Sequence, residues 1–190
     1  DFFIHELKSF TSSLEKEFQV DITPARISQG ISLCNENRRL LRRLFQFKKD
    51  ENSPISGLDT FYAILSSTIC HKGRHNEILT DCLAEANGRK VYRSGKKRFM
   101  LMGSELHDDQ IITYLESNGA LVASDELCTG TRYIWTDVEE RKEVFQALAE
   151  RYLLGVNCPI KRPGTLRFNH IERMLDEFKI NAAIMLHPKN

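Results

Sequence analysis

The stretch that decides the fold is Arg98-Phe99-Met100-Leu101-Met102-Gly103-Ser104, a short apolar run that ends in two small residues. Two similar runs follow, Ala120-Leu121-Val122-Ala123 and Ala182-Ala183-Ile184-Met185-Leu186, and segments with helical spacing lie between the runs. Continuous apolar runs of this length are typical of strands that are buried on both faces of a parallel sheet. The order therefore predicts an α/β fold, a Rossmann-like (flavodoxin-like) parallel sheet with flanking helices.

The sequence before this sheet is helical in pattern as far as Gly88. Apolar residues recur at steps of three and four, as on one face of a helix. Thr23 and Pro24 suit the start of a long helix to about Lys49, and Ser53-Pro54-Ile55-Ser56-Gly57 breaks it. We therefore predict a helical region over residues 1–96 and a parallel α/β domain over 97–190, incomplete at its C-terminal end.

The composition excludes several classes of protein. The 190 residues include 27 Lys and Arg against 26 Asp and Glu, a formal net charge of +1, so no nucleic-acid partner is expected. No apolar stretch approaches the length of a membrane-spanning helix, so no membrane partner is expected either. Five cysteines without a Cys-x-x-Cys pair indicate a reducing, cytoplasmic location rather than a secreted disulfide framework. Because the chain starts at Asp1, we expect it to be a fragment of a longer protein.

The predicted sheet selects candidate site residues, because parallel α/β sheets bind ligands beyond the carboxyl ends of their strands. Three loops lie there: Gly103–His107, Ser124–Arg132 and His187–Asn190. Small side chains let the backbone N–H groups of the first loop approach an anion. A thiolate in the second loop suits a soft metal, and its arginine suits a carboxylate or phosphate. The candidates for the crevice are Gly103, Ser104, Asp125, Thr129, Gly130 and Arg132, with Cys128 and Cys158 as metal ligands. An ordinary loop with a buried thiol is the alternative.

Other reactive residues are interpreted as structural. We expect Cys34, Cys70 and Cys82 to pack among apolar neighbours on helices. For His71 and His75, we favour an exposed helix start over a metal-binding pair. A basic cluster is interpreted as a solvated helix face or as ion pairs rather than as a phosphate site. Its members are Arg38, Arg39, Arg42, Arg43, Lys48 and Lys49.

Five segments in register support a more specific interpretation. They are Asn35-Glu36-Asn37-Arg38-Arg39-Leu40-Leu41-Arg42-Arg43-Leu44, Ser53–Gly57, Asp125-Glu126-Leu127-Cys128-Thr129-Gly130-Thr131-Arg132-Tyr133, Ala147-Leu148-Ala149-Glu150-Arg151-Tyr152 and Asn157-Cys158-Pro159. In order and spacing they resemble a subunit of the 2-hydroxyacyl-CoA dehydratase and benzoyl-CoA reductase family. The resemblance covers nearly the whole chain and points to the family rather than to a substrate.

The resemblance implies an oxygen-sensitive enzyme of anaerobes. Such an enzyme has two homologous subunits, and in the dehydratases each subunit can hold a [4Fe–4S] cluster. A separate ATP-dependent iron–sulfur activator protein supplies one electron to this complex. The electron forms a ketyl radical on an (R)-2-hydroxyacyl-CoA thioester, and loss of hydroxide and a β-proton gives the enoyl-CoA. A redox cofactor is physically reasonable here, because an unactivated β-hydrogen is too weak an acid for a side-chain base.

The resemblance also leaves alternatives open. A benzoyl-CoA reductase-type subunit would reduce an aromatic CoA thioester on the same fold, and a non-catalytic α/β assembly domain would do neither. Family subunits are longer than this chain, and cluster cysteines are expected before Asp1 and just after the strand that ends at Leu186. Cys128, Thr129, Gly130 and Arg132 would line the crevice for the cluster and the CoA thioester. The isolated fragment is expected to lack a full set of cluster ligands.

Overall fold

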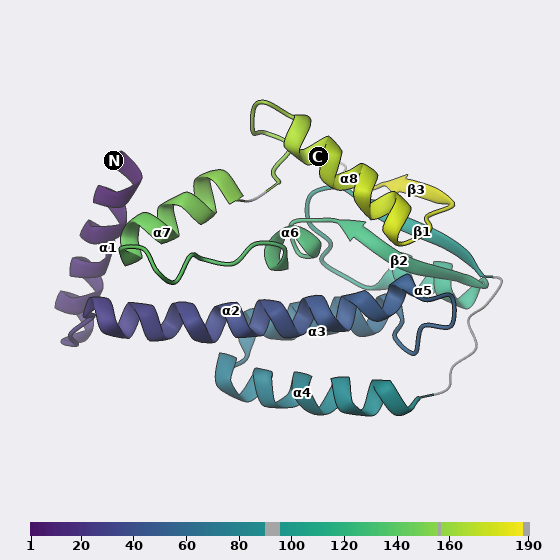
Figure 1. Cartoon of the computed structure of the whole chain (residues 1–190), viewed down its shortest axis with the longest axis horizontal. Helices are drawn as coiled ribbons and strands as arrows, with labels where there is room; N and C mark the ends of the chain where they lie inside the picture. The colour runs from purple at the N-terminus through teal and green to yellow at the C-terminus, as the bar shows by residue number, and fades with distance from the viewer. Residues whose placement is uncertain (90–95, 156, 188–190) are drawn as a thin grey trace.

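A computed structural model of the chain describes residues 1–89, 96–155 and 157–187. Helices fill the first half, and a three-stranded sheet with further helices fills the second (Figure 1). The helices and strands, in chain order, are α1 (Phe2–Phe18), α2 (Pro24–Gln46), the short helix η1 (Phe47–Lys49), α3 (Gly57–Ile69), α4 (Lys72–Gly88), β1 (Lys97–Met102), α5 (Gln110–Ser117), β2 (Ala120–Glu126), α6 (Thr131–Ile134), α7 (Val144–Glu150), the π-helix η2 (Arg151–Gly155), α8 (Thr165–Glu177) and β3 (Ala182–Met185).

The sheet has the strand order β2-β1-β3, and both pairs of neighbours are parallel. The chain thus leaves the central strand to one side through α5 and reaches the other side through the helices from α6 to α8. This is the doubly wound arrangement, and it confirms the predicted parallel α/β fold. The register between β1 and β2 shifts between Phe99 and Met100.

Apolar side chains from both halves of the chain bury the two faces of β1 and β2. One hydrophobic cluster joins Met100 and Leu121 to residues of α2, α4 and α8, and a second joins Leu101 and Val122 to α3 and α5. The C-terminal part of α2 and helices α3 and α4 therefore belong to the same core as the sheet, whereas α1 lies at the other end of α2 and contacts α7 (Figure 1). The domain boundary between residues 96 and 97 stays a prediction, and residues 90–95 beside it lie outside the described part.

Strand β3 differs from the expectation of burial on both faces. Ala182, Ala183 and Met185 are exposed, whereas every residue of β2 except Asp125 is fully buried. Both β2 and β3 are edge strands bonded to β1, but helices α3, α5, α6 and α8 pack against β2, whereas the main contacts of β3 within the described residues are with β1, which leaves its side chains exposed. The apolar run identified the strand correctly but not its place in the sheet.

Local signals set most helix boundaries. Thr23 caps α2, accepting a hydrogen bond from Arg26 N at 3.3 Å, and Pro24 occupies the first helical position as predicted. Between β2 and α8 the chain forms the four-residue α6 and then α7 from Val144, which continues as a π-helix from Arg151. Within the described ranges, no helix combines the length and the apolar character needed to cross a membrane.

Candidate functional site

The loops that follow β1 and β2 meet at the carboxyl edge of the sheet. Cys128 N donates to the Ser104 carbonyl at 2.6 Å, which joins the two loops. The Thr129 hydroxyl accepts from Leu106 N at 3.0 Å and donates to the Leu106 carbonyl at 3.3 Å. Gly103 sits under the end of β3, where an added Cβ atom would lie 2.8 Å from the Leu186 carbonyl oxygen. The predicted neighbours from two loops are therefore held together.

Asp125 fixes the shape of the second loop. Its Oδ1 accepts hydrogen bonds from Thr131 N at 2.7 Å and from Leu127 N at 3.3 Å. Its carbonyl accepts from the Thr131 hydroxyl at 2.6 Å. Gly130 lies so close that an added Cβ atom would stand 2.0 Å from Asp125 Oδ1. A carboxylate that folds back onto its own loop, with no side chain on Gly130, thus presents Cys128 and Thr129 at the edge of the sheet.

A buried cluster of one carboxylate and two guanidinium groups lies beside that loop. Glu126 is fully buried at the end of β2, and Arg132 donates to both of its carboxylate oxygens. Arg167 of α8 donates to the same two oxygens at 2.9 and 2.8 Å. Burial alone would raise the pKa of Glu126, but the hydrogen bonds from Arg167 and Arg132 outweigh it and lower that pKa. With two arginines to one glutamate, the cluster keeps a net positive charge.

Both candidate cysteine ligands lie next to this cationic cluster. Arg132 Nη1 is 3.2 Å from Cys128 Sγ, and the Cys128 side chain is exposed. Cys158 is partly buried and interacts electrostatically with Arg167 and Lys161. The net positive charge of the cluster beside these two thiols favours anionic groups at this place. The structure therefore brings Cys128, and more loosely Cys158, toward one place.

A cavity of about 670 Å³ opens at the carboxyl edge, where the connections from the central strand diverge. Ser104, Leu106, Ile111, Tyr114 and Leu186 are among its lining residues. His187 also lines it, whereas the predicted loop residues 188–190 lie outside the described part of the chain. Apolar walls with a few polar groups are the usual make-up of a small-molecule pocket. Of the predicted crevice residues Ser104 is in this lining, so the crevice itself stays a prediction.

The ligand set for a metal group is incomplete in the described residues. Across residues 1–89, 96–155 and 157–187, no group of three or more His, Cys, Asp or Glu side chains is placed to hold a metal ion. A [4Fe–4S] cluster is held by four thiolates, and this edge of the sheet brings at most Cys128 and Cys158 toward it. The residues present do not by themselves fit the cluster.

Two structural interpretations of cysteines were wrong. Cys70 and Cys82 are exposed rather than packed, and Cys34 is only partly buried. Cys70 follows the last residue of α3 and Cys82 lies on the outer side of α4, so helical spacing alone did not reveal which side faces the core.

The histidine pair also differs from its interpretation as an exposed helix start. His71 is exposed, but His75 is 3% exposed. Asn37 Nδ2 lies 2.7 Å from His75 Nδ1 and must donate to it, so Nε2 carries the proton and donates to the Ser66 hydroxyl at 3.0 Å. In this tautomer His75 cannot act as a base toward Ser66. It is a buried structural residue.

The basic cluster on α2 is used mainly for internal contacts. Arg39 pairs with Asp137 and Glu140, and Arg42 pairs with Asp137 at 2.9 Å, which confirms the ion-pair alternative for these two residues. Arg38 and Lys48, in contrast, are 5% and 1% exposed, so they do not form a solvated face. Their burial arises from packing against distant segments, which helical periodicity does not report.

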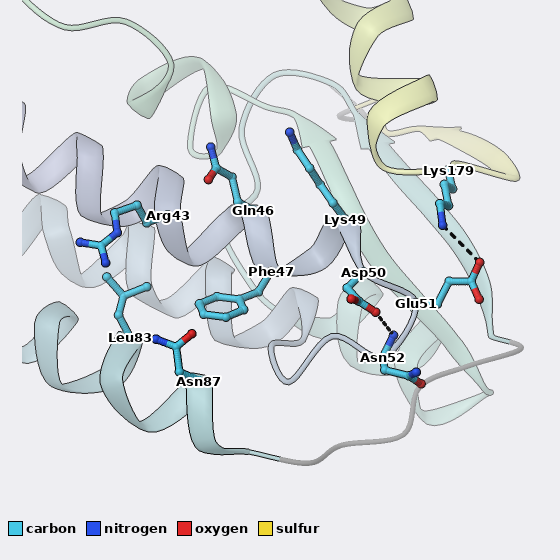
Figure 2. A pocket seen from close by; sticks show the side chains of 10 residues that line it. All are labelled: Arg43, Gln46, Phe47, Lys49, Asp50, Glu51, Asn52, Leu83, Asn87 and Lys179. Carbon is cyan, nitrogen blue, oxygen red and sulfur yellow. Dashed lines mark hydrogen bonds and ion pairs between the residues drawn. The ribbon is translucent and has the colours of Figure 1, made fainter.

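A second cavity, of about 880 Å³ and thus larger than the one at the carboxyl edge, lies away from the candidate site (Figure 2). It is bounded by the end of α2, the loop at Asp50–Asn52, α4 and Lys179, near the amino-terminal ends of the strands. Its charged groups are largely paired, because Lys179 binds Glu51 at 3.3 Å and Lys49 binds Glu177 at 2.6 Å. Size alone therefore does not make it the functional site.

Sequence reasoning missed Glu126 and Arg167 as parts of the site. Glu126 stood inside the recognised segment but was not selected, and Arg167 lies 41 residues further along the chain. A glutamate at the end of a buried strand was a usable signal, because a fully buried carboxylate requires a cationic partner. Nothing in the local sequence identified Arg167 as that partner.

A doubly wound sheet with a cavity and reactive side chains at its carboxyl edge defines a parallel α/β protein with a candidate ligand site. The sequence model of the family described as "2-hydroxyglutaryl-CoA dehydratase, D-component" matches residues 1–190. The chain belongs to this family, as its resemblance implied.

Curated relatives match at low identity. A protein of Escherichia coli provisionally named dehydratase subunit YjiM is 23% identical over 188 residues, covering 94% of this chain and 48% of the relative. A benzoyl-CoA reductase subunit of Thauera aromatica is 22% identical over 96% of this chain and 48% of the relative. Lactoyl-CoA dehydratase subunit beta of Anaerotignum propionicum is 21% identical over 72% of this chain and 37% of the relative. The chain thus spans about half the length, or less, of the curated relatives it matches.

Proposed function

We propose that this chain is part of a subunit of an iron–sulfur, radical-type (R)-2-hydroxyacyl-CoA dehydratase that forms an enoyl-CoA. The observation that carries the proposal is the exposed Cys128 thiol in contact with the Arg132 guanidinium, next to the cavity at the carboxyl edge. Family membership and the name of the lactoyl-CoA dehydratase relative support the dehydratase assignment.

The chain's own residues would contribute binding and charge. The cavity between Ser104 and Tyr114 would take the acyl part of the thioester, and its apolar walls would exclude water from it. The net positive charge of the Glu126, Arg132 and Arg167 cluster would favour anionic groups at this edge. The contact with Arg132 would hold the Cys128 sulfur at the carboxyl edge of the sheet.

A [4Fe–4S] cluster would need thiolates beyond those that the described residues provide. We propose that the further ligands belong to the half of the subunit that the relatives have and this chain does not span. The homologous second subunit and the ATP-dependent activator belong to the same proposal, since the relatives are named as subunits.

Iron content tests the role of Cys128. Full-length protein purified without oxygen should contain iron and show the absorption or electron paramagnetic resonance spectrum of a cluster. Cys128→Ser should lower the iron content and the activity, whereas Cys82→Ser, which removes an exposed thiol of α4, should leave both unchanged. Equal iron in the two variants would remove Cys128 from the ligand set. Absence of iron from the wild type would favour an assembly domain.

A benzoyl-CoA reductase-type activity is the second candidate. The Thauera relative is as similar to the chain as the dehydratase relatives are, so identity does not separate the two. Turnover of an (R)-2-hydroxyacyl-CoA and not of benzoyl-CoA, with the reduced activator present, is the expected result. The reverse preference would replace the first proposal by the second.

A further inference from the structure

Lys48 places a positive charge inside the protein, below the candidate site. The side chain is 1% exposed, and its Nζ donates to Thr60 Oγ1 at 2.7 Å and to the Val122 carbonyl at 3.3 Å. Nζ also lies 3.7 Å from the centre of the Phe45 ring. No carboxylate among the described residues is within ion-pair distance of it. A buried ammonium group of this kind requires a negative charge nearby.

The partly buried carboxyl group of Asp125 lies in the lining of the same small cavity as Lys48. Its Oδ1 accepts the backbone N–H groups of Leu127 and Thr131, which gives the site loop its shape. In the described part of the chain, no guanidinium or ammonium group lies within ion-pair distance of its carboxylate. The buried Lys48 and the partly buried Asp125 therefore both lack a direct partner of opposite charge among the described residues.

One small cavity has both side chains in its lining. Its volume is about 20 Å³, and Lys48, Thr60, Asp125, Thr129 and Gly130 are among its lining residues. The wall is mostly apolar, and its polar side chains are those of Lys48, Thr60, Asp125 and Thr129. A cavity of more than about 10 to 15 Å³ has room for one water molecule, which needs two to four polar partners. The ammonium group, whose third N–H is not used by Thr60 or Val122, and the carboxylate are suitable partners for such a water.

We propose that Lys48 is a positioning residue for the candidate site: one water in this cavity joins it to Asp125, and the pair holds the loop of Cys128 and Arg132. Lys48 is not one of the candidate site residues, and it acts on the loop only through Asp125. The proposal rests on the proposed function for the importance of that loop.

The electrostatic surroundings support the coupling. Burial lowers the pKa of Lys48 to about 8, and the negative charges of Asp125, Glu116 and Asp59 oppose this fall while Arg98 adds to it. Burial raises the pKa of Asp125, and its hydrogen bonds to Thr131 and Leu127 and the charge of Lys48 oppose that rise. Each of the two charges thus makes the other less costly to bury.

The test is amide hydrogen exchange in the full-length protein, a readout that needs neither iron nor substrate. Lys48→Met removes the charge and should speed exchange of the Leu127 and Thr131 amides by about tenfold or more, because one buried charge loses its partner. Lys49→Met is the matched control. Lys49 is the next residue, is partly exposed and pairs with Glu177, so exchange at the two loop amides should stay the same.

A double variant separates coupling from simple loss of packing. Asp125→Asn alone should also speed exchange, but Lys48→Met with Asp125→Asn should exchange more slowly than the product of the two single effects requires, because no buried charge is left unpaired. Multiplicative single effects, or equal rates in Lys48→Met and Lys49→Met, would overturn the proposal. An equal acceleration at Leu79 and Leu83 in α4 would also overturn it, since Lys48 would then support the whole fold.

Discussion

Glu126 is the residue on which the geometry of the candidate site most depends. Its carboxylate is fully buried and accepts hydrogen bonds from both Arg132 and Arg167. Glu126→Gln keeps the shape but removes the charge, which leaves two guanidinium groups without a counter-ion. We expect the free energy of unfolding to fall by about 3 to 5 kcal/mol, measured by urea denaturation.

The matched control is Glu150→Gln on α7. Glu150 pairs with Lys142 at the surface, where solvent screens the pair, so its loss should cost much less stability than the loss of the Glu126 charge. Similar costs for the two variants would show that the Glu126 cluster contributes no more than a surface ion pair.

At this scale the sequence predicted residue types better than environments. Asp125, Thr129, Gly130 and Arg132 could be selected because they follow a buried strand, and the structure does place them at the carboxyl edge of the sheet. Burial of Lys48 and His75, and exposure of Cys70 and Cys82, depend on contacts with distant segments. Local hydrophobic periodicity contains no information about those contacts.

The connection from β2 to α6 is the element that shapes the site, and Gly130 is the tightest point in it. Its backbone does not need positive φ, but an added Cβ atom would stand 2.0 Å from Asp125 Oδ1. Gly130→Ala should therefore displace the loop and lower the free energy of unfolding by about 1 to 3 kcal/mol, measured by urea denaturation.

Gly30→Ala is the control variant, and it should change the free energy of unfolding in the opposite direction. Gly30 lies within α2, and nothing stands within 4 Å of an added Cβ atom. Alanine has a higher helix propensity than glycine, so this variant should be more stable than the wild type by up to about 1 kcal/mol. The same sign for both variants would contradict the steric account of Gly130.

Elements were predictable where one periodic signal determined them. The three apolar runs and the long helix α2 agree with the sequence pattern, since both depend on spacing within one segment. The four-residue α6 and the π-helix at Arg151–Gly155 are too short to produce a periodic signal. Their geometry is set by bonds to other segments.

Across the whole molecule, segments far apart in the sequence converge on residues 133–138. Asn35 donates to the Val138 carbonyl at 2.8 Å, and Arg42 donates to the Ile134 carbonyl at 2.5 Å. Arg151 donates to the Tyr133 and Thr136 carbonyls at 2.9 and 3.0 Å. Three of the five segments that carried the family resemblance therefore meet here, and they hold the chain that leaves α6. All three segments thus stabilise the same stretch of backbone, residues 133–138.

Acid should destabilise the folded molecule through its buried histidines. His170 is 5% exposed and packs against Trp135 with ring centroids 4.5 Å apart. Burial, followed by the nearby charge of Arg173, lowers the pKa of His170 to about 4, against about 6.5 in an unfolded chain. Between these values the unfolded chain binds more protons, so the free energy of unfolding falls as the pH falls from 6.5 to 4.

Full protonation of His170 should lower the free energy of unfolding by about 3 kcal/mol, since each unit of pKa shift corresponds to about 1.4 kcal/mol. Burial and Lys72 lower the pKa of His75 as well, so its contribution has the same sign. Urea denaturation at steps of pH should show a shallower slope in His170→Gln than in the wild type. His5→Gln, which changes an exposed residue of α1, should keep the wild-type slope. If His170→Gln and the wild type lose stability equally over this range, the acid sensitivity comes from groups other than His170.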